Sequence, residues 1–400
     1  MRVLHIITRL IVGGAQENTL LSVEGLDRMP EFEVTLATGM DEGPEGALID
    51  RARRTCRLVV VPELRRSIRP VSDLRAFWSL YRLIRKGRYH IVHTHSSKAG
   101  VLGRIAARLA GTPFVVHTLH SLVFHDYQPW LVNRALRVVK RALALTTDEF
   151  ISVSSIISDK AIAARIAPPN KFCTIYSGME LDWFLNAEAD GVAVRREFGI
   201  HPEAPVVGKI ARLFALKGHA ELLDAAPAIV KRHPDVRFLL VGDGILFEHV
   251  QHRAEELGVR ENCVFVGLVE RERIPEMLSA MDVVVHTSLR EGLARVLPQA
   301  LAMRKPCVAY DLDGAPEVVV PGVTGYLVQP RDTPGLVEAV SRLLSDRELR
   351  ARMGEAGRRY VDPRFRAETM VSGIAEVYAQ LIKQHHQRLE KFNRRHACRT

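Results

Sequence analysis

The hydrophobic positions of the chain follow two alternating patterns. Short apolar runs bounded by polar residues are typical of buried strands, and longer segments with apolar residues every three or four positions are typical of helices. In the first half, this pattern predicts strands over residues 2–8, 33–38, 90–95, 113–120, 149–154 and 171–178. It predicts helices over residues 15–26, 73–86, 99–111, 129–145 and 155–166. Such alternation indicates a parallel sheet, whose ligands bind at the carboxyl ends of the strands.

The alternation stops over residues 179–204 and resumes with a strand that begins at Pro205. Further strands are predicted over residues 237–244, 263–269, 282–286, 306–312 and 325–330. Helices are predicted over residues 219–232, 245–257 and 273–280, and another begins near Ala294 or Arg295. Two helical segments follow the last strand, and Pro363 separates them, because proline interrupts a helix.

A chain of 400 residues that is 47% hydrophobic exceeds what one core usually supports. We therefore predict an α/β protein with two doubly wound, Rossmann-like domains, over residues 1–185 and 205–365. Residues 186–204 are predicted to be a linker. Residues 366–400 are predicted to form a C-terminal helix and a basic tail.

The stretch from Asp282 to Met303 carries the strongest candidate chemistry. Gly292 permits a tight turn between a strand and a helix, and Pro298 is tolerated only where a helix leaves its amides unpaired. The first free amides would then face outward beside Glu291, with Gln299 about one turn inside the helix. This layout suits a nucleotide-sugar, although a surface acid before a capped core helix remains the alternative.

Composition narrows the class of protein. No apolar run approaches the roughly 18–20 residues that a transmembrane helix needs, and the apolar N-terminus is interpreted as a first strand rather than a signal peptide. The cysteines are odd in number and widely spaced, which argues against a disulfide framework or a zinc site and fits a reducing cytoplasm. They are Cys56, Cys173, Cys263, Cys307 and Cys398.

The net charge of +10 is unevenly distributed. Residues 1–180 hold 25 basic and 16 acidic residues, and residues 383–400 hold six basic and one acidic residue. The densest basic segment runs from Arg51 to Arg88 and contains the helix predicted over residues 73–86, in which Arg75, Arg82 and Arg85 flank aromatic residues. The charge alone leaves nucleic acid or an anionic membrane surface open as the partner.

Three smaller motifs bear on cofactor and metal binding. Gly13 and Gly14 follow the first strand without a GxGxxG pattern, and no acidic residue ends the second strand, which argues against a nicotinamide site. His93 and His95 would share one face of a strand and could hold a metal, but no third ligand is evident. The pair Asp311 and Asp313 imitates a metal-binding motif, and its place after a strand favours a loop.

Several ordered motifs resemble family 4 glycosyltransferases, which are retaining enzymes of the GT-B fold. They are GGAQ, HTHSSKAGVLGR, ARLFALKGH, LLVGDG, FVGLV, the S-x-x-E-G stretch and GVTGYLV, and they span nearly the whole chain. The resemblance implies two Rossmann-like domains that face a cleft, with a C-terminal helix returning toward the N-terminal domain. It also implies transfer of a sugar from a nucleoside-diphosphate sugar, with a UDP-sugar favoured.

The resemblance assigns roles to matching residues. Arg212 and Lys217 would clamp the diphosphate, whose charge grows as the glycosidic bond breaks, and Glu291 would bind the hydroxyl groups of the donor sugar. His120 would contact that sugar from the first domain. The other implied donor-binding residues are Gly14, Gly242, Gly244, Val266, Gly292, Leu293, Ala294 and Gln299. Gly14 would also line the acceptor side of the cleft. The acceptor side would include Gly13, His95 and Lys98.

One position departs from the family pattern E-x(7)-E, because Gln299 replaces the second glutamate. A neutral amide binds a ribose diol more weakly than a carboxylate does, by about 1 kcal/mol. In the family's usual account no side chain forms a covalent intermediate, and the leaving diphosphate takes the acceptor's proton. The resemblance implies no cofactor and no divalent metal, because cationic side chains stabilise the leaving group.

The acceptor implied by the resemblance is a saccharide or a lipid-linked saccharide of surface-polysaccharide or glycolipid synthesis, and no nucleic acid is implied. The basic helix over residues 73–86 would then lie on an anionic bilayer, with the protein in the cytoplasm, peripheral to the inner face of the plasma membrane. The alternative is a helix that packs its aromatic residues inward and leaves its arginines in water. Two other functions stay open: a nucleotide-sugar epimerase of the same fold, and a catalytically silent binding protein.

Overall fold

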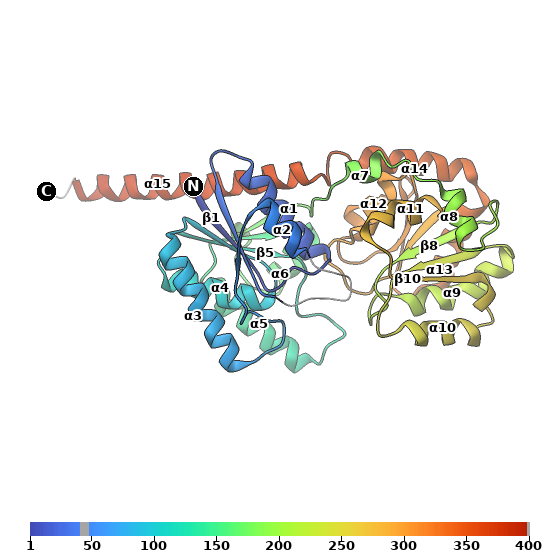
Figure 1. Cartoon of the computed structure of the whole chain (residues 1–400), viewed down its shortest axis with the longest axis horizontal. Helices are drawn as coiled ribbons and strands as arrows, with labels where there is room; N and C mark the ends of the chain where they lie inside the picture. Colours follow the sequence, from blue (N-terminus) through green and yellow to red (C-terminus); the bar gives the residue numbers. More distant parts are fainter. Residues whose placement is uncertain (41–47, 398–400) are drawn as a thin grey trace. The chain divides into compact units, whose positions relative to one another are not determined.

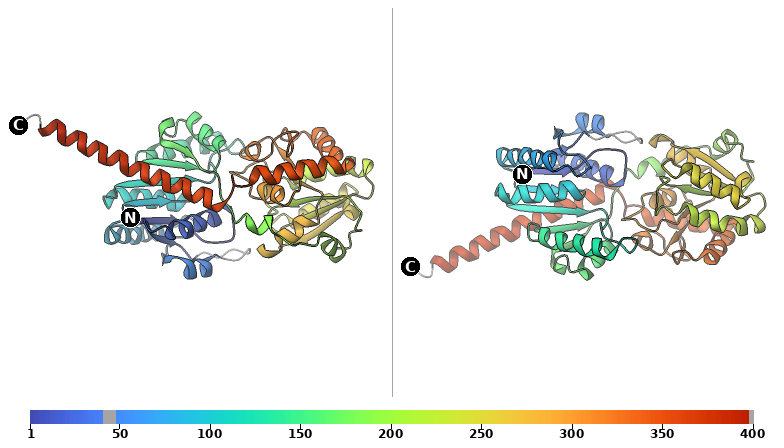
Figure 2. Two further views of the ribbon diagram at one scale, coloured as in Figure 1. Left: turned by 90° about the horizontal axis from the view of Figure 1, so that it is seen from above. Right: turned by 90° about the horizontal axis from the view of Figure 1, so that it is seen from below.

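The computed structural model describes residues 1–40 and 48–397, and the chain divides into two compact units. One unit comprises residues Met1–Met179 together with the chain from Ala367 onward, and the other comprises Glu180–Arg366. Each unit contains one fully parallel sheet with helices on both faces (Figures 1 and 2), which confirms the predicted pair of Rossmann-like domains. Cys398, in the predicted basic tail, lies outside the described residues.

The sheet of the first unit has the strand order β3-β2-β1-β4-β5-β6-β7. Its strands are β1 (Arg2–Ile7), β2 (Glu33–Thr38), β3 (Arg57–Val60), β4 (Ile91–Thr94), β5 (Phe114–Leu119), β6 (Glu149–Ser152) and β7 (Phe172–Thr174). Its helices are α1 (Gly14–Asp27), α2 (Ile49–Thr55), α3 (Pro70–Gly87), α4 (Ser97–Leu109), α5 (Trp130–Ala144), α6 (Ser155–Ala163) and α15 (Ala367–Ala397).

Two of these elements were not predicted. Strand β3 lies at the edge of the sheet, paired only with β2, and none of its residues is fully buried, so it lacks the continuous apolar run of the central strands. Helix α2 is seven residues long and contains three arginines, which hides its periodicity. Strand β3 and most of α2 lie in the basic segment from Arg51 to Arg88.

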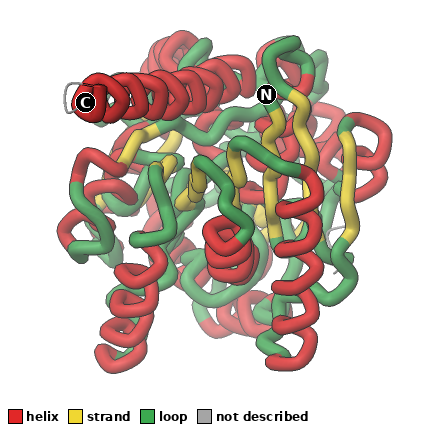
Figure 3. The backbone as a smooth tube through the Cα atoms, turned by 90° about the vertical axis from the view of Figure 1, so that its left-hand side faces the viewer, coloured by secondary structure: helices red, strands yellow, loops and turns green. Residues whose placement is uncertain are grey.

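Helix α15, which leads to the C-terminus marked in Figure 3, returns to the first unit, as predicted. It packs against α1 on one face of the sheet. The amide of Ala367 donates to the carbonyl of Met179, 3.0 Å away. A Cβ atom on Gly25 would lie 2.4 Å from Val371, so the close packing of α1 on α15 requires a glycine there. Tyr378 of α15 is completely buried against the sheet.

The second unit has the strand order β10-β9-β8-β11-β12-β13. Its strands are β8 (Val206–Ile210), β9 (Arg237–Val241), β10 (Cys263–Gly267), β11 (Val283–His286), β12 (Cys307–Tyr310) and β13 (Gly325–Val328). Its helices are α7 (Asp182–Leu185), α8 (Gly191–Glu197), α9 (His219–Arg232), α10 (Phe247–Glu256), α11 (Ile274–Ser279), α12 (Val296–Ala302), α13 (Thr333–Ser345) and α14 (Arg347–Val361).

The structure differs from the predicted segments at two places in this unit. Residues 186–204 belong to the second unit, where Arg195 of α8 donates to Asp282 over 2.9 Å, rather than standing apart as a linker. Between β13 and Pro363 there are two helices instead of one. The side chain of Asp346 accepts the amide of Leu349 and caps α14, which ends α13 at Ser345.

Both sheets reverse their strand order at one point. In the second unit, β8 lies between β9 and β11, so the connections on its two sides run over opposite faces of the sheet. In open parallel sheets ligands bind in the crevice beside such a switch point, at the carboxyl ends of the strands. The segments that leave β8 and β11 at this point begin at Ala211 and Thr287.

Candidate active site

The loops that follow β8 and β11 are bonded to each other through their backbones. The amide of Leu289 donates to the carbonyl of Leu216 over 2.8 Å, and the hydroxyl of Thr287 donates to the carbonyl of Gly218. Gly218 has φ of 73°, and a Cβ atom there would lie 1.8 Å from the carbonyl oxygen of Thr287. Only glycine permits this approach, so the sequence fixes the two loops side by side.

Lys217 and Glu291 meet where these two loops join. The Lys217 ammonium forms an ion pair with Glu291 Oε1, and the two side chains are 25% and 24% exposed. The amide of Glu291 donates to the carboxylate of Asp313 over 2.7 Å, which also anchors the loop that follows β12. Asp313 therefore positions the backbone of Glu291 from a loop, as its place in the sequence suggested.

Arg212, the first predicted diphosphate contact, lies exposed in the loop after β8, with its guanidinium 5.3 Å from the centre of the Phe214 ring. The loop after β9 packs closely against it. Cβ atoms on Gly242 and Gly244 would lie 2.2 and 2.5 Å from the carbonyl oxygens of Ala211 and Leu213. These two glycines are thus explained by the close approach of two loops on the same side of the sheet as Lys217.

Val266 lies on β10, two strands away from β8, and is half-buried. The loops after β9 and β10 are joined, because the amide of Gly242 donates to the carbonyl of Gly267 over 2.8 Å. The loops after β11, β8, β9 and β10 thus lie in a row along the end of the sheet, and Val266 lies at the β10 end of this row. The assignment of Val266 and Gly242 to the base end of the donor stays a prediction.

Helix α12 begins at Val296, one or two residues later than predicted. Pro298 is its third residue, a position where a missing amide hydrogen costs nothing. Gly292, Leu293 and Ala294 are buried in the turn before the helix, and the carbonyl of Gly292 accepts the amide of Gly314 over 3.1 Å. Gln299 lies within the helix and is half-buried.

Two buried residues beneath the ion pair were missed by the sequence analysis. Lys209 of β8 is 1% exposed, its ammonium donates to Thr287 Oγ1 over 3.0 Å, and burial lowers its pKa to about 7. His286 ends β11, and its Nε2 lies 4.0 Å from Glu291 Oε1. A polar residue inside or at the end of an apolar strand is the signal that could have found both.

The electrostatics of His286 make it neutral. Burial first, and then the charges of Lys209 and Lys217, hold the pKa of this imidazole well below its usual range. Within the described residues, its buried Nε2 has no hydrogen-bond partner. An unsatisfied buried nitrogen costs free energy, so its presence beside Glu291 is typical of a site that a ligand completes.

The predicted site residues of the first unit occupy different environments. His120 follows β5 and is half-buried, with burial lowering its pKa to about 4. His95 is completely buried, so its predicted place on the acceptor side finds no support in the structure. Lys98 donates to Asp73 Oδ1 over 2.6 Å and to the carbonyl of Ser67, which ties α4 to α3.

Gly13 and Gly14 lie at the start of α1, at the carboxyl end of β1. Gly13 precedes the helix with an extended backbone (φ 167°), and a Cβ atom there would lie 2.9 Å from the side-chain oxygen of Gln16. Gly14 is the first helical residue and is exposed. The two glycines thus keep this turn narrow, at the strand end where a ligand of the first sheet would bind.

A third histidine lies beside His93 and His95, although none was evident in the sequence. His5 of β1 joins them, and one ligand atom from each ring lies within 4.8 Å of the others. The sequence could not reveal this neighbour because it depends on the pairing of β1 with β4, which sets His5 opposite His93. All six ring nitrogens of the cluster already have hydrogen-bond partners, so the geometry does not call for an ion.

The family models match the two units separately. Residues 13–178 match a glycosyl transferase 4-like domain, and residues 193–360 match the glycosyl transferases group 1 domain. An N-acetyl-α-D-glucosaminyl L-malate synthase of Bacillus anthracis is 30% identical over 78% of this chain and 81% of its own length. The chain therefore belongs to the family of glycosyltransferases with these two domains, and it is a glycosyltransferase of the GT-B fold.

Two further proteins extend the comparison. The UDP-Gal:α-D-GlcNAc-diphosphoundecaprenol α-1,3-galactosyltransferase of Escherichia coli is 29% identical over 96% of this chain and 97% of its own length. The crystal structure of Anabaena HepE in complex with UDP and glucose has a TM-score of 0.80, with 22% identity over 94% of this chain and 99% of that one. The second likeness supports the fold alone.

The buried lysine yields a prediction about stability. Folding lowers the pKa of Lys209 from 10.5 to about 7, so the unfolded chain binds more protons between these two values and the free energy of unfolding rises with pH there. Lys209→Met should remove this penalty and increase the free energy of unfolding by about 1–3 kcal/mol at pH 6–7. The gain should shrink toward pH 10. Urea unfolding at several pH values measures it, and a gain independent of pH would contradict the buried charge.

Proposed function

We propose that this enzyme transfers a sugar, with retention of configuration, from a nucleoside-diphosphate sugar to a saccharide or lipid-linked saccharide acceptor. A UDP-sugar is the favoured donor, and the product belongs to surface-polysaccharide or glycolipid synthesis. The observation that carries the proposal is the Lys217–Glu291 ion pair at the switch point of the second sheet. It supplies a cation for a diphosphate and an acceptor for sugar hydroxyl groups at the same place.

In this proposal the chemistry depends on charge rather than on a covalent intermediate. Arg212 and Lys217 stabilise the diphosphate as its negative charge grows, and the leaving diphosphate takes the proton of the acceptor hydroxyl. Glu291 accepts hydrogen bonds from donor-sugar hydroxyl groups and holds the Lys217 ammonium in place before the donor binds. His286 offers a neutral nitrogen beside them. His120 bonds the same sugar from the first unit, and no cofactor or metal takes part.

Gln299 and the buried turn before α12 are proposed to bind the nucleotide end of the donor. The amides of Leu293 and Ala294 precede the helix and would meet phosphate or sugar oxygens, and the Gln299 amide would bind the ribose. Gly242, Gly244 and Val266 would lie beside the base. Gly13, Gly14 and Lys98 are proposed to lie on the acceptor side.

A donor screen tests this function. The purified protein is incubated with UDP- and GDP-sugars, with and without lipid-linked and free saccharides, and released nucleoside diphosphate is measured together with the anomeric configuration of the product. We expect nucleotide release that depends on an acceptor, and retention. Interconversion of the donor sugar without release would instead indicate an epimerase, and nucleotide binding without turnover would indicate a silent binding protein.

The ion pair yields a prediction that separates its two members. Glu291→Ala should lower turnover at least about tenfold while changing the Kd for the nucleoside diphosphate by less than about threefold, because Glu291 faces the sugar. Lys217→Ala should weaken nucleoside-diphosphate binding and reduce turnover, each by about 1–3 kcal/mol. Calorimetry and initial rates measure the effects. Glu338→Ala, which breaks an exposed pair with Arg232, is the matched control. Equal loss of nucleotide affinity in both site variants would contradict the assignment.

A lipid-linked acceptor would require a protein surface that meets a membrane. No described helix is long and apolar enough to span one. The predicted surface, α3, is mixed. It buries Ala76, Leu80 and Ile84 against the sheet, while Trp78 is 48% exposed. The predicted inward packing of the aromatic residues is thus partial, because Phe77 and Tyr81 pack against the core whereas Trp78 and the arginines remain outside.

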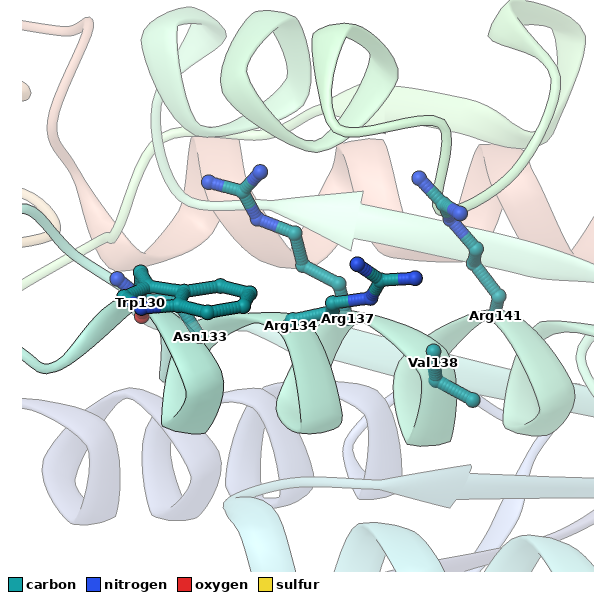
Figure 4. Close-up of a pocket in the computed structure, with 6 residues that line it drawn as sticks. All are labelled: Trp130, Asn133, Arg134, Arg137, Val138 and Arg141. Atoms are coloured by element: carbon teal, nitrogen blue, oxygen red, sulfur yellow. The ribbon is translucent and has the colours of Figure 1, made fainter.

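Helix α5 offers a larger apolar surface. Leu131, Val138 and Leu145 are seven residues apart and therefore share one face, and they are 61%, 56% and 84% exposed. The helix contains no acidic residue and has four basic ones, Arg134, Arg137, Lys140 and Arg141. Figure 4 shows a pocket along its basic side, which Arg134, Arg137 and Arg141 line together with Trp130.

These features support α5 as a helix that lies in the interface of an anionic bilayer. Exposed apolar residues would enter the acyl region, and each nearby arginine or lysine would add about 1 kcal/mol through the lipid charge. We therefore propose a peripheral position at the inner face of the plasma membrane, with α5 carrying more of the contact than α3.

The membrane proposal predicts the behaviour of one double variant. Leu131→Ser with Val138→Ser should reduce sedimentation with anionic vesicles at least about fivefold, because both changes remove apolar area from the same face. Ile245→Ser, at an exposed apolar residue of the second unit, should leave sedimentation unchanged. Wild-type binding should fall with salt and be weak on neutral vesicles. Binding that ignores salt and lipid charge would favour a soluble acceptor.

A further inference from the structure

A continuous hydrogen-bonded chain connects helix α15 to His120 through the interior of the first unit. Its inner end is Thr118, whose hydroxyl lies 2.7 Å from Nε2 of His93, and Nδ1 of His93 lies 2.6 Å from the hydroxyl of Tyr378. That hydroxyl lies 3.1 Å from Nε2 of His5. The chain therefore passes from β5 through β4 to α15 and back to β1.

The second half of the chain reaches the strand end. Nδ1 of His5 lies 3.0 Å from Nε2 of His95, and Nδ1 of His95 lies 3.1 Å from Nε2 of His120. His5 and His95 are completely buried, and His120 is half-buried at the carboxyl end of β5. Nδ1 of His120 is the one ring nitrogen that the chain leaves unused.

All four imidazoles of the chain are neutral near pH 7. Burial lowers the pKa of His5 to about 3 and that of His120 to about 4, and it holds the pKa values of His93 and His95 well below the usual range. A neutral imidazole carries one N–H and one lone pair. Each ring must therefore donate on one side and accept on the other, so the protons along the chain can be ordered in only two ways.

In the first order the hydroxyl of Thr118 donates to His93, His93 donates to Tyr378, and Tyr378 donates to His5. His5 then donates to His95 and His95 to His120, which leaves His120 with its proton on Nδ1. In the second order every bond is reversed, and Nδ1 of His120 carries a lone pair instead. The inner end of the chain therefore determines which hydrogen-bonding group His120 offers at the strand end.

Thr118 distinguishes the two orders. In the second order its oxygen accepts from His93, and its own proton needs another acceptor. The structure gives none for it among the described residues, and Thr118 is only 4% exposed. A buried donor without a partner is destabilising. In the first order each N–H and O–H from Thr118 to His95 has an acceptor, and the one N–H left over is that of His120 at the strand end, where a ligand could accept it. The first order is therefore favoured.

We propose that Thr118 and Tyr378 are positioning residues that act through the histidine chain to keep the proton of His120 on Nδ1, so that His120 presents an N–H donor to an oxygen of the donor sugar. The contact with the sugar rests on the proposed function, whereas the order of the protons rests on the chain itself. Through Tyr378 the C-terminal helix α15 thus influences His120, although Tyr378 itself touches no substrate.

The proton order is measured directly by nuclear magnetic resonance. Long-range ¹H–¹⁵N spectra of the full chain with ¹⁵N-labelled histidine distinguish protonated from unprotonated ring nitrogens, and His120→Gln identifies the signals of His120. We expect a protonated Nδ1 on His120 in the wild type. A wild-type His120 protonated at Nε2 would overturn the proposal.

Isosteric variants test the two positioning residues. Thr118→Val and Tyr378→Phe each remove one hydroxyl of the chain, and both should give His120 a measurable fraction with its proton on Nε2. Thr118→Ser keeps the hydroxyl and should restore the wild-type spectrum. Thr94→Val is the matched control, because it removes an equally buried hydroxyl that bonds His117 outside the chain. An unchanged His120 spectrum in both Thr118→Val and Tyr378→Phe would overturn the proposal.

Activity provides a second readout. With the donor and acceptor found by the screen, Thr118→Val and Tyr378→Phe should lower kcat/KM about fivefold, the effect of one neutral hydrogen bond, with Thr118→Ser and Thr94→Val near the wild type. A change in the His120 spectrum without any loss of activity would overturn the contact with the sugar and leave the proton order standing. If no donor is turned over at all, the proposed function fails and the spectra still decide the order of the chain.

Discussion

The parallel pairing of β8 with β11 is the constraint on which the active site depends. The register sets Val207 opposite Val283 and Gly208 opposite Val284, so both strands end at the same edge of the sheet. Strand β8 belongs to one half of the sheet and β11 to the other. The connections that follow them therefore run over opposite faces of the sheet, although the two loops begin side by side. The ion pair of Lys217 with Glu291 forms where these loops meet.

The charges around this point are arranged by depth. Lys217 and Glu291 are partly exposed, where a ligand can reach them, while Lys209 and His286 lie beneath them in the core. Both buried residues lower the stability of the fold. The ammonium of Lys209 loses its hydration, and Nε2 of His286 has no hydrogen-bond partner within the described residues. Proteins commonly retain such costs where function requires them, and the position of this one beneath the ion pair fits that explanation.

Much of the fold could be predicted from the sequence because the central strands are buried on both faces and form continuous apolar runs. The loop positions of Lys217, Glu291 and Asp313 followed from the same pattern, since each lies in the loop that follows such a strand. The edge strand β3 could not be predicted, because it is only partly buried. Helix α8 was missed since its seven residues are too few to show a period.

The remaining errors concern contacts between distant parts of the chain. His5 and His93 become neighbours through strand register, and Tyr378 reaches them from a helix more than 280 residues later in the sequence. Local patterns contain no information about such contacts, so His95 was expected on the acceptor side although it lies buried inside this cluster. The sequence showed correctly that histidines gather at the strand ends, and the structure shows which of them are accessible.

Hydrogen–deuterium exchange of the full chain with and without UDP, and with GDP in parallel, tests most directly whether the loops after β8 and β11 form the nucleotide site. The structure predicts that a bound nucleotide slows exchange of the backbone amides in residues 211–218 and 287–295, on both sides of the Lys217–Glu291 pair. Protection by neither nucleotide in these two segments, or protection confined to other parts of the chain, would contradict the assignment.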